Sequence, residues 1–262
     1  MKALKRNFKD FWRCRFLLKE LVLKGIRLKY RKSYLGIIWS LIEPLLTTVV
    51  LVVVFGTLFN RAKDQTFAVY IMSGRLLYSF FSAGTKGACK EVRKNASMIK
   101  KVYVPKYLYP LSNIIFNYII FLISLIVFIP VMIYAKQMPT LMMWQVIPAL
   151  IELFVLVLGM GLILSVMDVF FRDTEYLWNV ITMIIMYMSA IFYPVDRLVK
   201  TGFAWILKFN PLYCIIHQMR GGMLGYHVSK WEYLYPAAVA VVLLLIGVAV
   251  FKKKQDDFIL HM

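Results

Sequence analysis

Long apolar runs alternate with short polar breaks along the whole of this chain. Six of these runs are long enough to cross a bilayer: Gly36–Phe59, Phe67–Ala88, Leu108–Tyr134, Leu141–Met167, Tyr176–Tyr193 and Tyr233–Phe251. A helix needs about 20 residues to cross a bilayer. In lipid every backbone N–H and C=O group must form its hydrogen bond within the segment, as it does in a helix. The pattern therefore predicts an all-α integral membrane protein with six transmembrane helices.

A seventh apolar stretch, Phe203–Met219, is interrupted by Lys208 and by the pair Asn210 and Pro211. Broken helix at membrane depth is tolerated only where protein or water covers it. We therefore expect a re-entrant or interfacial region before the last span. Three glycines between residues 221 and 225 allow close backbone approach. A compact external lid and an ordinary extracellular loop both fit this segment.

The first 35 residues have an amphipathic pattern. Apolar and aromatic residues recur near one helical face: Phe8, Trp12, Phe16, Val22, Ile26 and Tyr30. Basic residues lie mostly on the other face, although Arg15 and Lys19 fall on the apolar side. This pattern predicts a helix in the membrane interface, with lysines facing anionic lipid. A basic anchor that only fixes topology and a specific role in gating are both compatible with it.

Charge sets the orientation of the spans. Of the 32 Lys and Arg residues, twenty-three lie in segments 1–35, 86–107, 168–175 and 252–254, and eight lie in the polar segments of the opposite side. By the positive-inside rule both termini are cytoplasmic, and this requires an even number of spans. The chain reads as one domain, 1–262: a cytoplasmic interfacial segment 1–35, six spans within 36–251, and a cytoplasmic tail 252–262.

Several function classes find no support in the residues. The net charge of +19 flanks hydrophobic spans, so it indicates topology and contact with membrane lipids, and no nucleic acid partner is expected. There is no GxxxxGK[ST] loop, no metal-ligand spacing and no catalytic constellation. We therefore predict no catalytic residue, no metal site and no cofactor in this chain. Two intramembrane acids, Glu43 and Glu152, are few for an ion-coupled carrier, so the pattern favours a conduit powered by another protein.

Short motifs, in order along the chain, resemble the permease subunits of bacterial polysaccharide ABC exporters of the ABC-2 type. The matching segments are Tyr30–Leu45, Asn95–Lys106, Phe170–Asp173 with Tyr176–Trp178, Phe192–Pro194 and Asn210–Tyr213. They resemble the entry to the first span, the loop after the second span, the loop after the fourth span, the exit of the fifth span and the re-entrant region. The family includes permeases for O-antigen, teichoic acid and capsular polysaccharide.

The resemblance implies a division of labour. Two copies of this subunit would pair as a homodimer in the bacterial cytoplasmic (inner) membrane and would bind two copies of a separate ABC ATPase. That partner would bind ATP and Mg²⁺ and hydrolyse ATP, so this chain is not expected to be an enzyme. The substrate would be a lipid-linked polysaccharide. The alternatives are an ABC-2 permease for a drug or lipid, and a membrane enzyme acting on lipid-linked sugars, which should show clustered acids.

The loop 93–106 is the predicted contact with the ATPase. Asn95 or Ser97 would cap a short helix whose apolar face holds Met98, Ile99 and Val102. In the family this stretch resembles the coupling helix, and a basic loop that only fixes topology is the alternative. The residues assigned to the contact are Asn95, Ser97, Met98, Ile99, Lys100, Lys101 and Val102. In the later break, Arg172 and Asp173 form a local ion pair or contact the ATPase.

Six side chains of the first two spans are candidate contacts for conduit or substrate: Trp39, Glu43, Phe55, Phe59, Arg75 and Tyr78. Aromatic rings stack on sugars, and they also form ordinary belts at the membrane interface. The Arg75 guanidinium would hold a lipid phosphate, snorkel outward or form an internal ion pair. Glu43, next to Pro44, would face a wet lumen or pack through a buried hydrogen bond.

Overall fold

The computed structural model describes residues 14–31, 33–61, 63–101, 104–138, 140–195 and 204–258, and within these ranges all regular elements are helical. Phe8, Trp12, Val102 and Phe203 of the sequence predictions lie outside them. The longer helices are α2 (Arg15–Tyr30), α3 (Trp39–Leu58), α4 (Thr66–Lys94), α6 (Leu108–Ser124), α8 (Val146–Phe170), α9 (Thr174–Met188), α12 (Pro211–Leu224) and α13 (Trp231–Lys254). The short elements are η1 (Gly36–Ile38), α5 (Ala96–Ile99), η2 (Leu125–Val127), α7 (Phe128–Tyr134), η3 (Leu141–Gln145) and α11 (Ala204–Lys208).

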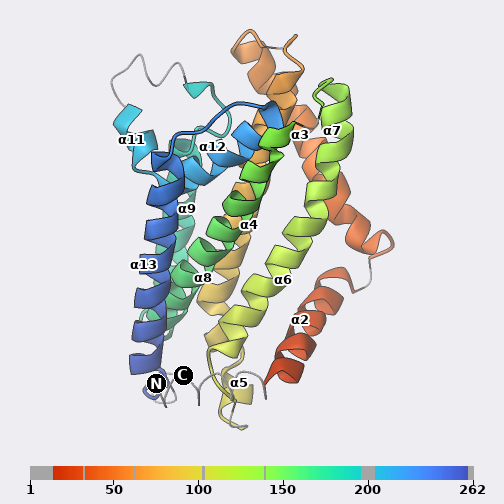
Figure 1. Cartoon of the computed structure of the whole chain (residues 1–262). Helices are drawn as coiled ribbons and strands as arrows, with labels where there is room; N and C mark the ends of the chain where they lie inside the picture. Colours follow the sequence, from red (N-terminus) through yellow and green to blue (C-terminus); the bar gives the residue numbers. More distant parts are fainter. Residues whose placement is uncertain are drawn as a thin grey trace.

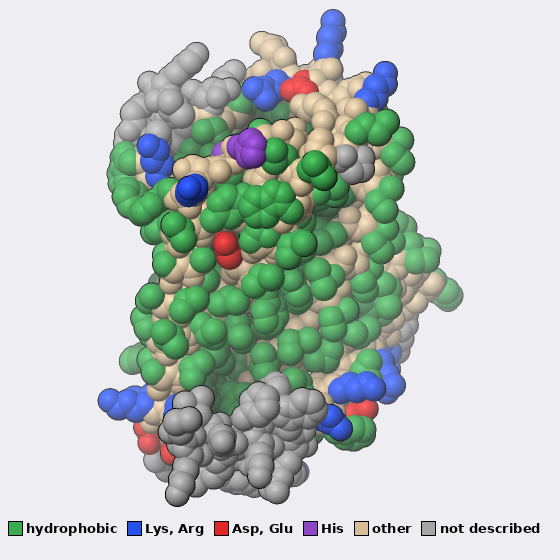
Figure 2. All heavy atoms as spheres, viewed as in Figure 1, with side chains coloured by type: hydrophobic (Ala, Val, Ile, Leu, Met, Phe, Trp, Pro, Cys, Tyr) green, Lys and Arg blue, Asp and Glu red, His purple; other side chains and the backbone are tan. Residues whose placement is uncertain are grey.

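The long helices α3, α4, α6 with α7, α8, α9 and α13 run side by side in one bundle (Figure 1). α5, the start of α2 and the end of α13 lie at one end, and α12 lies at the other. We call these ends the basic end, after the lysines of segments 90–101 and 252–254, and the α12 end. Figure 2 shows hydrophobic side chains over the middle of the molecule and Lys and Arg near its two ends. This distribution fits a bundle with an apolar belt.

Four helical stretches are long and apolar enough to span a membrane: Gly36–Leu58, Leu108–Tyr134, Leu141–Phe170 and Trp231–Lys254. They confirm four of the predicted spans to within a few residues. α4, which contains the predicted second span, has 29 residues but is not among the four. It carries Arg75 and Lys86, and it is buried along most of its length against α3, α6, α8, α9 and α12. Because protein surrounds α4, it needs less apolar surface than a helix that faces lipid.

The predicted fifth span, Tyr176–Tyr193, is wrong at its C-terminal end. α9 ends at Met188 after 15 residues, about 22 Å of helix, whereas the hydrocarbon core of a bilayer is about 30 Å thick. The helix stops because Ala190 adopts a left-handed backbone conformation, with φ of +45°. Side chains of other helices bind the carbonyl groups that follow, so the segment after Met188 has partners without continuing the helix.

Close backbone contact holds α8 against α13. A Cβ atom on Gly159 would lie 2.5 Å from the Leu244 nitrogen, and one on Gly247 would lie 2.7 Å from the Gly159 oxygen. These distances are too short for any larger side chain to fit without moving a helix. Small residues that let helix backbones approach are a common basis of packing in membranes.

The predicted break in the seventh apolar stretch is confirmed. α11 ends at Lys208, and α12 begins at Pro211. The Asn210 side chain accepts hydrogen bonds from the backbone N–H groups of Leu212 and Tyr213, at 3.0 and 3.3 Å, and so caps α12. Gly225, with φ of +77°, ends this helix.

α2 packs against α6, where a Cβ on Gly25 would already lie 3.2 Å from the Phe116 ring. Val22 is its one buried residue, and Phe16 is 71% exposed. At the other terminus, Phe258 is fully buried and packs edge-on against Phe251 with ring centroids 5.3 Å apart. Part of the predicted tail therefore belongs to the folded bundle.

Candidate functional site

An ion network at the basic end joins three helices. Arg93, in the last turn of α4, places its Nε 3.2 Å from Asp168 Oδ2 of α8 and its Nη2 2.8 Å from Glu175 Oε2 of α9. Lys90 Nζ lies 3.2 Å from the other oxygen of Glu175. Asp168 is fully buried, whereas the partners around it keep partial contact with solvent. Arg93 therefore ties the end of α4 to the turn between α8 and α9.

The predicted ATPase contact begins directly after this network. α5 is a single helical turn, with Asn95 at its N-cap position. The Asn95 side chain forms no cap bond; its amide donates instead to the carbonyl oxygen and the carboxylate of Glu91, at 2.8 and 2.9 Å. Ser97 is exposed and forms no cap either. The expected capping is wrong, because the chain enters α5 from α4 with Asn95 turned back toward the preceding helix.

The exposed surface of this loop is smaller than expected. Met98, Lys100 and Lys101 are exposed, but Ile99 is only 6% exposed. It packs in a cluster with buried residues of the neighbouring helices: Val92, Tyr109, Leu162, Val166, Val169, Phe251 and Phe258. The prediction that Ile99 forms part of an exposed apolar face is wrong, because one side of this short helix lies on the bundle. Of the predicted apolar residues that the structure describes, Met98 and Ile99, only Met98 is exposed to a partner.

Arg172 and Asp173 lie in the turn between α8 and α9, and both are exposed. No ion pair joins these two described residues, so the expected local ion pair is not formed. Glu175, two positions later, makes the ion pairs of this turn. The ion pairs at this turn therefore belong to the network of Lys90, Arg93 and Glu175.

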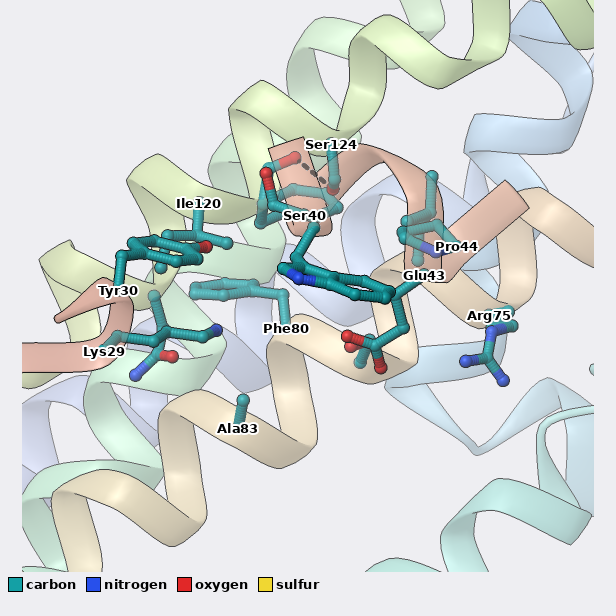
Figure 3. Close-up of a pocket in the computed structure, with 15 residues that line it drawn as sticks. Lys29, Tyr30, Ser40, Glu43, Pro44, Arg75, Phe80, Ala83, Ile120 and Ser124 are labelled. Atoms are coloured by element: carbon teal, nitrogen blue, oxygen red, sulfur yellow. Dashed lines mark hydrogen bonds between the residues drawn. The ribbon is translucent and has the colours of Figure 1, made fainter. Parts of the chain in front are cut away.

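A cavity of about 110 Å³ lies between α2, α3, α4 and α6 (Figure 3). Three of the predicted substrate contacts, Trp39, Glu43 and Arg75, line it. Figure 3 shows the Glu43 carboxylate between Lys29 on one side and Arg75 on the other. The other lining residues are Tyr30, Ser40, Pro44, Leu76, Ser79, Phe80, Ala83, Asn117, Ile120, Phe121 and Ser124. The structure thus brings together residues that the sequence assigned separately.

The charged groups of this cavity are spaced apart. In the described part of the chain, no group lies within ion-pair distance of Arg75 or Glu43, so the internal ion pair proposed for Arg75 is not formed. Although Lys29 is an exposed residue, desolvation by the surrounding side chains lowers its pKa, and the Glu43 carboxylate opposes this shift. The cations and the carboxylate therefore retain hydrogen-bonding capacity toward a third molecule.

The remaining predicted contacts lie elsewhere. Phe55 and Phe59 stack with centroids 6.0 Å apart, and Phe55 also stacks on Phe192 at 5.3 Å. The Tyr78 hydroxyl donates to the carbonyl oxygen of Thr182 at 3.0 Å and so joins α4 to α9. These three residues do not line the cavity.

A buried arginine at the α12 end was missed by the sequence analysis, which counted Arg220 only as an external charge. Its side chain is fully buried. Nε donates to the Tyr70 carbonyl at 3.2 Å, Nη2 donates to the Ala190 carbonyl at 3.0 Å, and the guanidinium carbon lies 3.5 Å from the centroid of the Tyr70 ring. Arg220 therefore holds α12 against α4 and the end of α9. The signal in the sequence was an arginine inside a mostly apolar helix.

These arrangements can bind and position, and the described residues include no group of His, Cys, Asp and Glu that fits a metal ion. The basic end offers an exposed surface, which includes Met98, Lys100 and Lys101, next to the Arg93 ion network. The cavity offers cations, a carboxylate, hydroxyls and aromatic rings in one place. Such a combination of groups suits the binding of a polar ligand.

Comparison with known proteins gives consistent relatives over almost the full length. The O-antigen export system permease protein RfbA of Klebsiella pneumoniae is 26% identical over 92% of this chain and 93% of its own length. A Myxococcus xanthus protein of the same name is 25% identical over 97% and 98%. The polysialic acid transport protein KpsM of Escherichia coli is 24% identical over 91% and 93%.

The family comparison covers most of the chain as well. The pattern of the ABC-2 type transporter family matches residues 16–224, which include every long helix except α13. All of the ordered motifs of the sequence, from Tyr30 to Tyr213, fall inside this match. This chain therefore belongs to the ABC-2 type transporter family.

Proposed function

We propose that this chain is the transmembrane subunit of an ABC transporter that exports a lipid-linked polysaccharide across the bacterial cytoplasmic membrane. The observation that carries the proposal is its similarity, over more than nine-tenths of its length, to permeases for O-antigen and polysialic acid. The relatives are named for the export or transport of a glycan, and these glycans differ. The common function is therefore export of a glycan, and the particular sugar is a property of each system.

The proposed topology has six spans, with α4 and α9 added to the four apolar stretches. α4 is about 43 Å long at 1.5 Å per residue, which exceeds the bilayer core. α9 is short, but it packs against α4 and α8 within the bundle. The basic end would face the cytoplasm, because cytoplasmic segments carry the excess of Lys and Arg. Both termini would then be cytoplasmic.

The energy source would be a separate ATPase subunit that binds ATP and Mg²⁺. Its docking surface would be the exposed part of the loop after α4, with Met98 as the apolar contact and Lys100 and Lys101 beside it. Movement at this loop would reach α8 and α9 through Arg93, which joins their turn to α4. Short helices that dock in a partner's groove are a common mode of recognition.

The active assembly would contain two copies of this chain and two ATPase subunits. α3 supports the pairing of two copies, because only 11% of its apolar stretch is buried within the single chain. Valines at several positions of this helix are more than half exposed: Val49, Val50, Val53 and Val54. A second copy and lipid would share this surface.

Deletion of the gene tests the proposal in the host. Lipid-linked glycan should accumulate inside the cell, and surface glycan should disappear, because synthesis continues while export stops. A plasmid with the natural gene should restore export, and a plasmid with Met98→Asp should not. Normal surface glycan in the deletion strain, with accumulation of a drug or another lipid, would instead favour a different ABC-2 substrate.

A further inference from the structure

A second hollow adjoins the cavity and shares one residue with it. It has a volume of about 250 Å³ and is lined by Leu46, Thr47, Val50 and Leu51 of α3 together with Arg75 of α4. Leu46 and Val50 are 58% and 60% exposed, so this groove lies open on the surface of the bundle. Arg75 is the only residue common to the two linings.

The two hollows differ in chemistry. Apart from Arg75 and the Thr47 hydroxyl, the groove is lined by branched aliphatic side chains. The hydroxyl of Thr47 accordingly bonds back to the Glu43 carbonyl of its own helix, at 2.6 Å, and does not offer itself to a ligand. An apolar chain is therefore the occupant that fits the groove.

The cavity beyond Arg75 has the opposite character. Trp39 and Tyr30 offer aromatic faces of the kind that stack on sugar rings, and Glu43 offers carboxylate oxygens for hydroxyl groups. A free phosphate anion alone would be repelled by the Glu43 carboxylate. A sugar next to a phosphate uses both charges, because its hydroxyls donate to the carboxylate while the phosphate takes the guanidinium.

Size limits what the cavity can hold. Its volume of about 110 Å³ matches the liquid volume of only a few water molecules, at roughly 30 Å³ each. It has room for the phosphate group and for one edge of a sugar ring, and the rest of the glycan would have to lie outside it. A longer glycan would have to leave through the open side.

From this arrangement we infer that the joined hollows bind the phosphate-bearing head of a lipid-linked sugar, with the apolar lipid chain along Leu46 and Val50, the phosphate at Arg75 and the edge of the first sugar between Trp39 and Glu43. This inference rests on the proposed function and names the part of the substrate that this chain recognises. Arg75 of α4 is shared by the groove and the cavity, so the three subsites follow the order of the three parts in such a lipid.

Binding of defined lipids tests the assignment. The full chain, in complex with its ATPase partner in nanodiscs, is titrated with undecaprenyl phosphate and with undecaprenyl pyrophosphate-linked N-acetylglucosamine, and bound lipid is counted by native mass spectrometry. Phosphatidylglycerol and inorganic phosphate serve as the competing sources of phosphate. We expect both isoprenoid probes to bind and neither competitor to displace them.

Three variants separate the subsites, and each has a matched control. Arg75→Gln should weaken both probes by about tenfold, since a charged hydrogen bond is lost, whereas Lys63→Gln removes an exposed charge outside the hollows. Val50→Trp should block both probes by filling the groove. Val49→Trp adds the same ring on the same helix, at 59% exposure but outside the groove, and should bind normally. Trp39→Leu should weaken the sugar-bearing probe alone.

The outcomes distinguish this inference from the proposed function. If Arg75→Gln and Val50→Trp bind both probes like their controls while the complex still exports glycan, the site assignment is wrong and the proposed function stands. If phosphatidylglycerol displaces the probes equally, the hollows hold ordinary phospholipid and the assignment is also wrong. If the natural complex exports no glycan in the host, the proposed function itself fails.

Discussion

Arg93→Leu is the most informative single change at the basic end, because it removes one partner of a buried ion pair. Asp168 would lose the cation that balances its carboxylate in a fully buried position, and Glu175 would lose its 2.8 Å contact. Loss of one member of a buried pair costs about 3–5 kcal/mol. The Arg93 side chain is 35% exposed, so solvent screens part of this effect, and we expect the lower end, about 3 kcal/mol.

The expected change in melting temperature follows from this free energy. A loss of 1 kcal/mol lowers Tm by roughly 2–4 °C in proteins of about this size, so Arg93→Leu should lower it by roughly 6–12 °C. Thermal unfolding of the purified subunit in nanodiscs, followed by tryptophan fluorescence, measures the shift. Lys90→Leu is the control, because its ion pair with Glu175 is half exposed and contributes at most about 1 kcal/mol.

A double variant tests the reason for the loss. Arg93→Leu combined with Asp168→Leu removes the buried charge together with its partner, so most of the lost stability should return. The reasoning is refuted if Arg93→Leu melts within the shift of Lys90→Leu. It is equally refuted if the double variant melts no higher than the single one.

Three further predictions concern other contacts. Met98→Asp should abolish co-purification of the ATPase subunit at unchanged Tm, whereas Ile99→Ala should lower Tm through a loss of about 2–5 kcal/mol; retention of the partner by Met98→Asp would contradict docking there. Gly159→Ala should cost about 1–3 kcal/mol in thermal unfolding, because its Cβ would meet backbone at 2.5 Å, and Gly25→Ala less, because its Cβ would meet a side chain at 3.2 Å; equal shifts would contradict the packing described. Phe258→Ala should lower Tm through a loss of about 3–5 kcal/mol, and an unchanged Tm would show that the buried end of the chain contributes nothing.

Much of the fold could be predicted from local pattern. The apolar runs that became α3, α6 with α7, α8 and α13 were placed to within a few residues, because lipid-facing helices must be apolar along their own length. The break at Asn210 was also predictable, since Asn followed by Pro is a local signal for a helix start. These features depend on residues close together in the sequence, so they can be predicted from it.

Features that depend on distant contacts could not be read in this way. The end of α9 at Met188 depends on Arg220, which binds the Ala190 carbonyl from a later helix. The burial of Ile99 depends on how α5 lies against the bundle. The pairing of Arg93 with Asp168 requires the relative register of α4 and α8, which hydrophobic periodicity does not give.

The candidate site shows the same division. Trp39, Glu43 and Arg75 were singled out as unusual polar or aromatic residues in apolar runs, and the structure brings them into one cavity. Lys29 was read only as one of many basic residues near the N-terminus, because nothing in the sequence indicated that the end of α2 would reach this cavity. Phe55, Phe59 and Tyr78 satisfied the same sequence criterion but pack elsewhere.

The central claim is that this chain is a passageway driven by a separate ATPase. Its most direct test is reconstitution of the chain in vesicles, with and without the ATPase subunit, followed by measurement of lipid-linked glycan transferred across the bilayer. The account predicts ATP-dependent transfer when both proteins are present and none with this chain alone. Sustained transfer by the chain alone would contradict it.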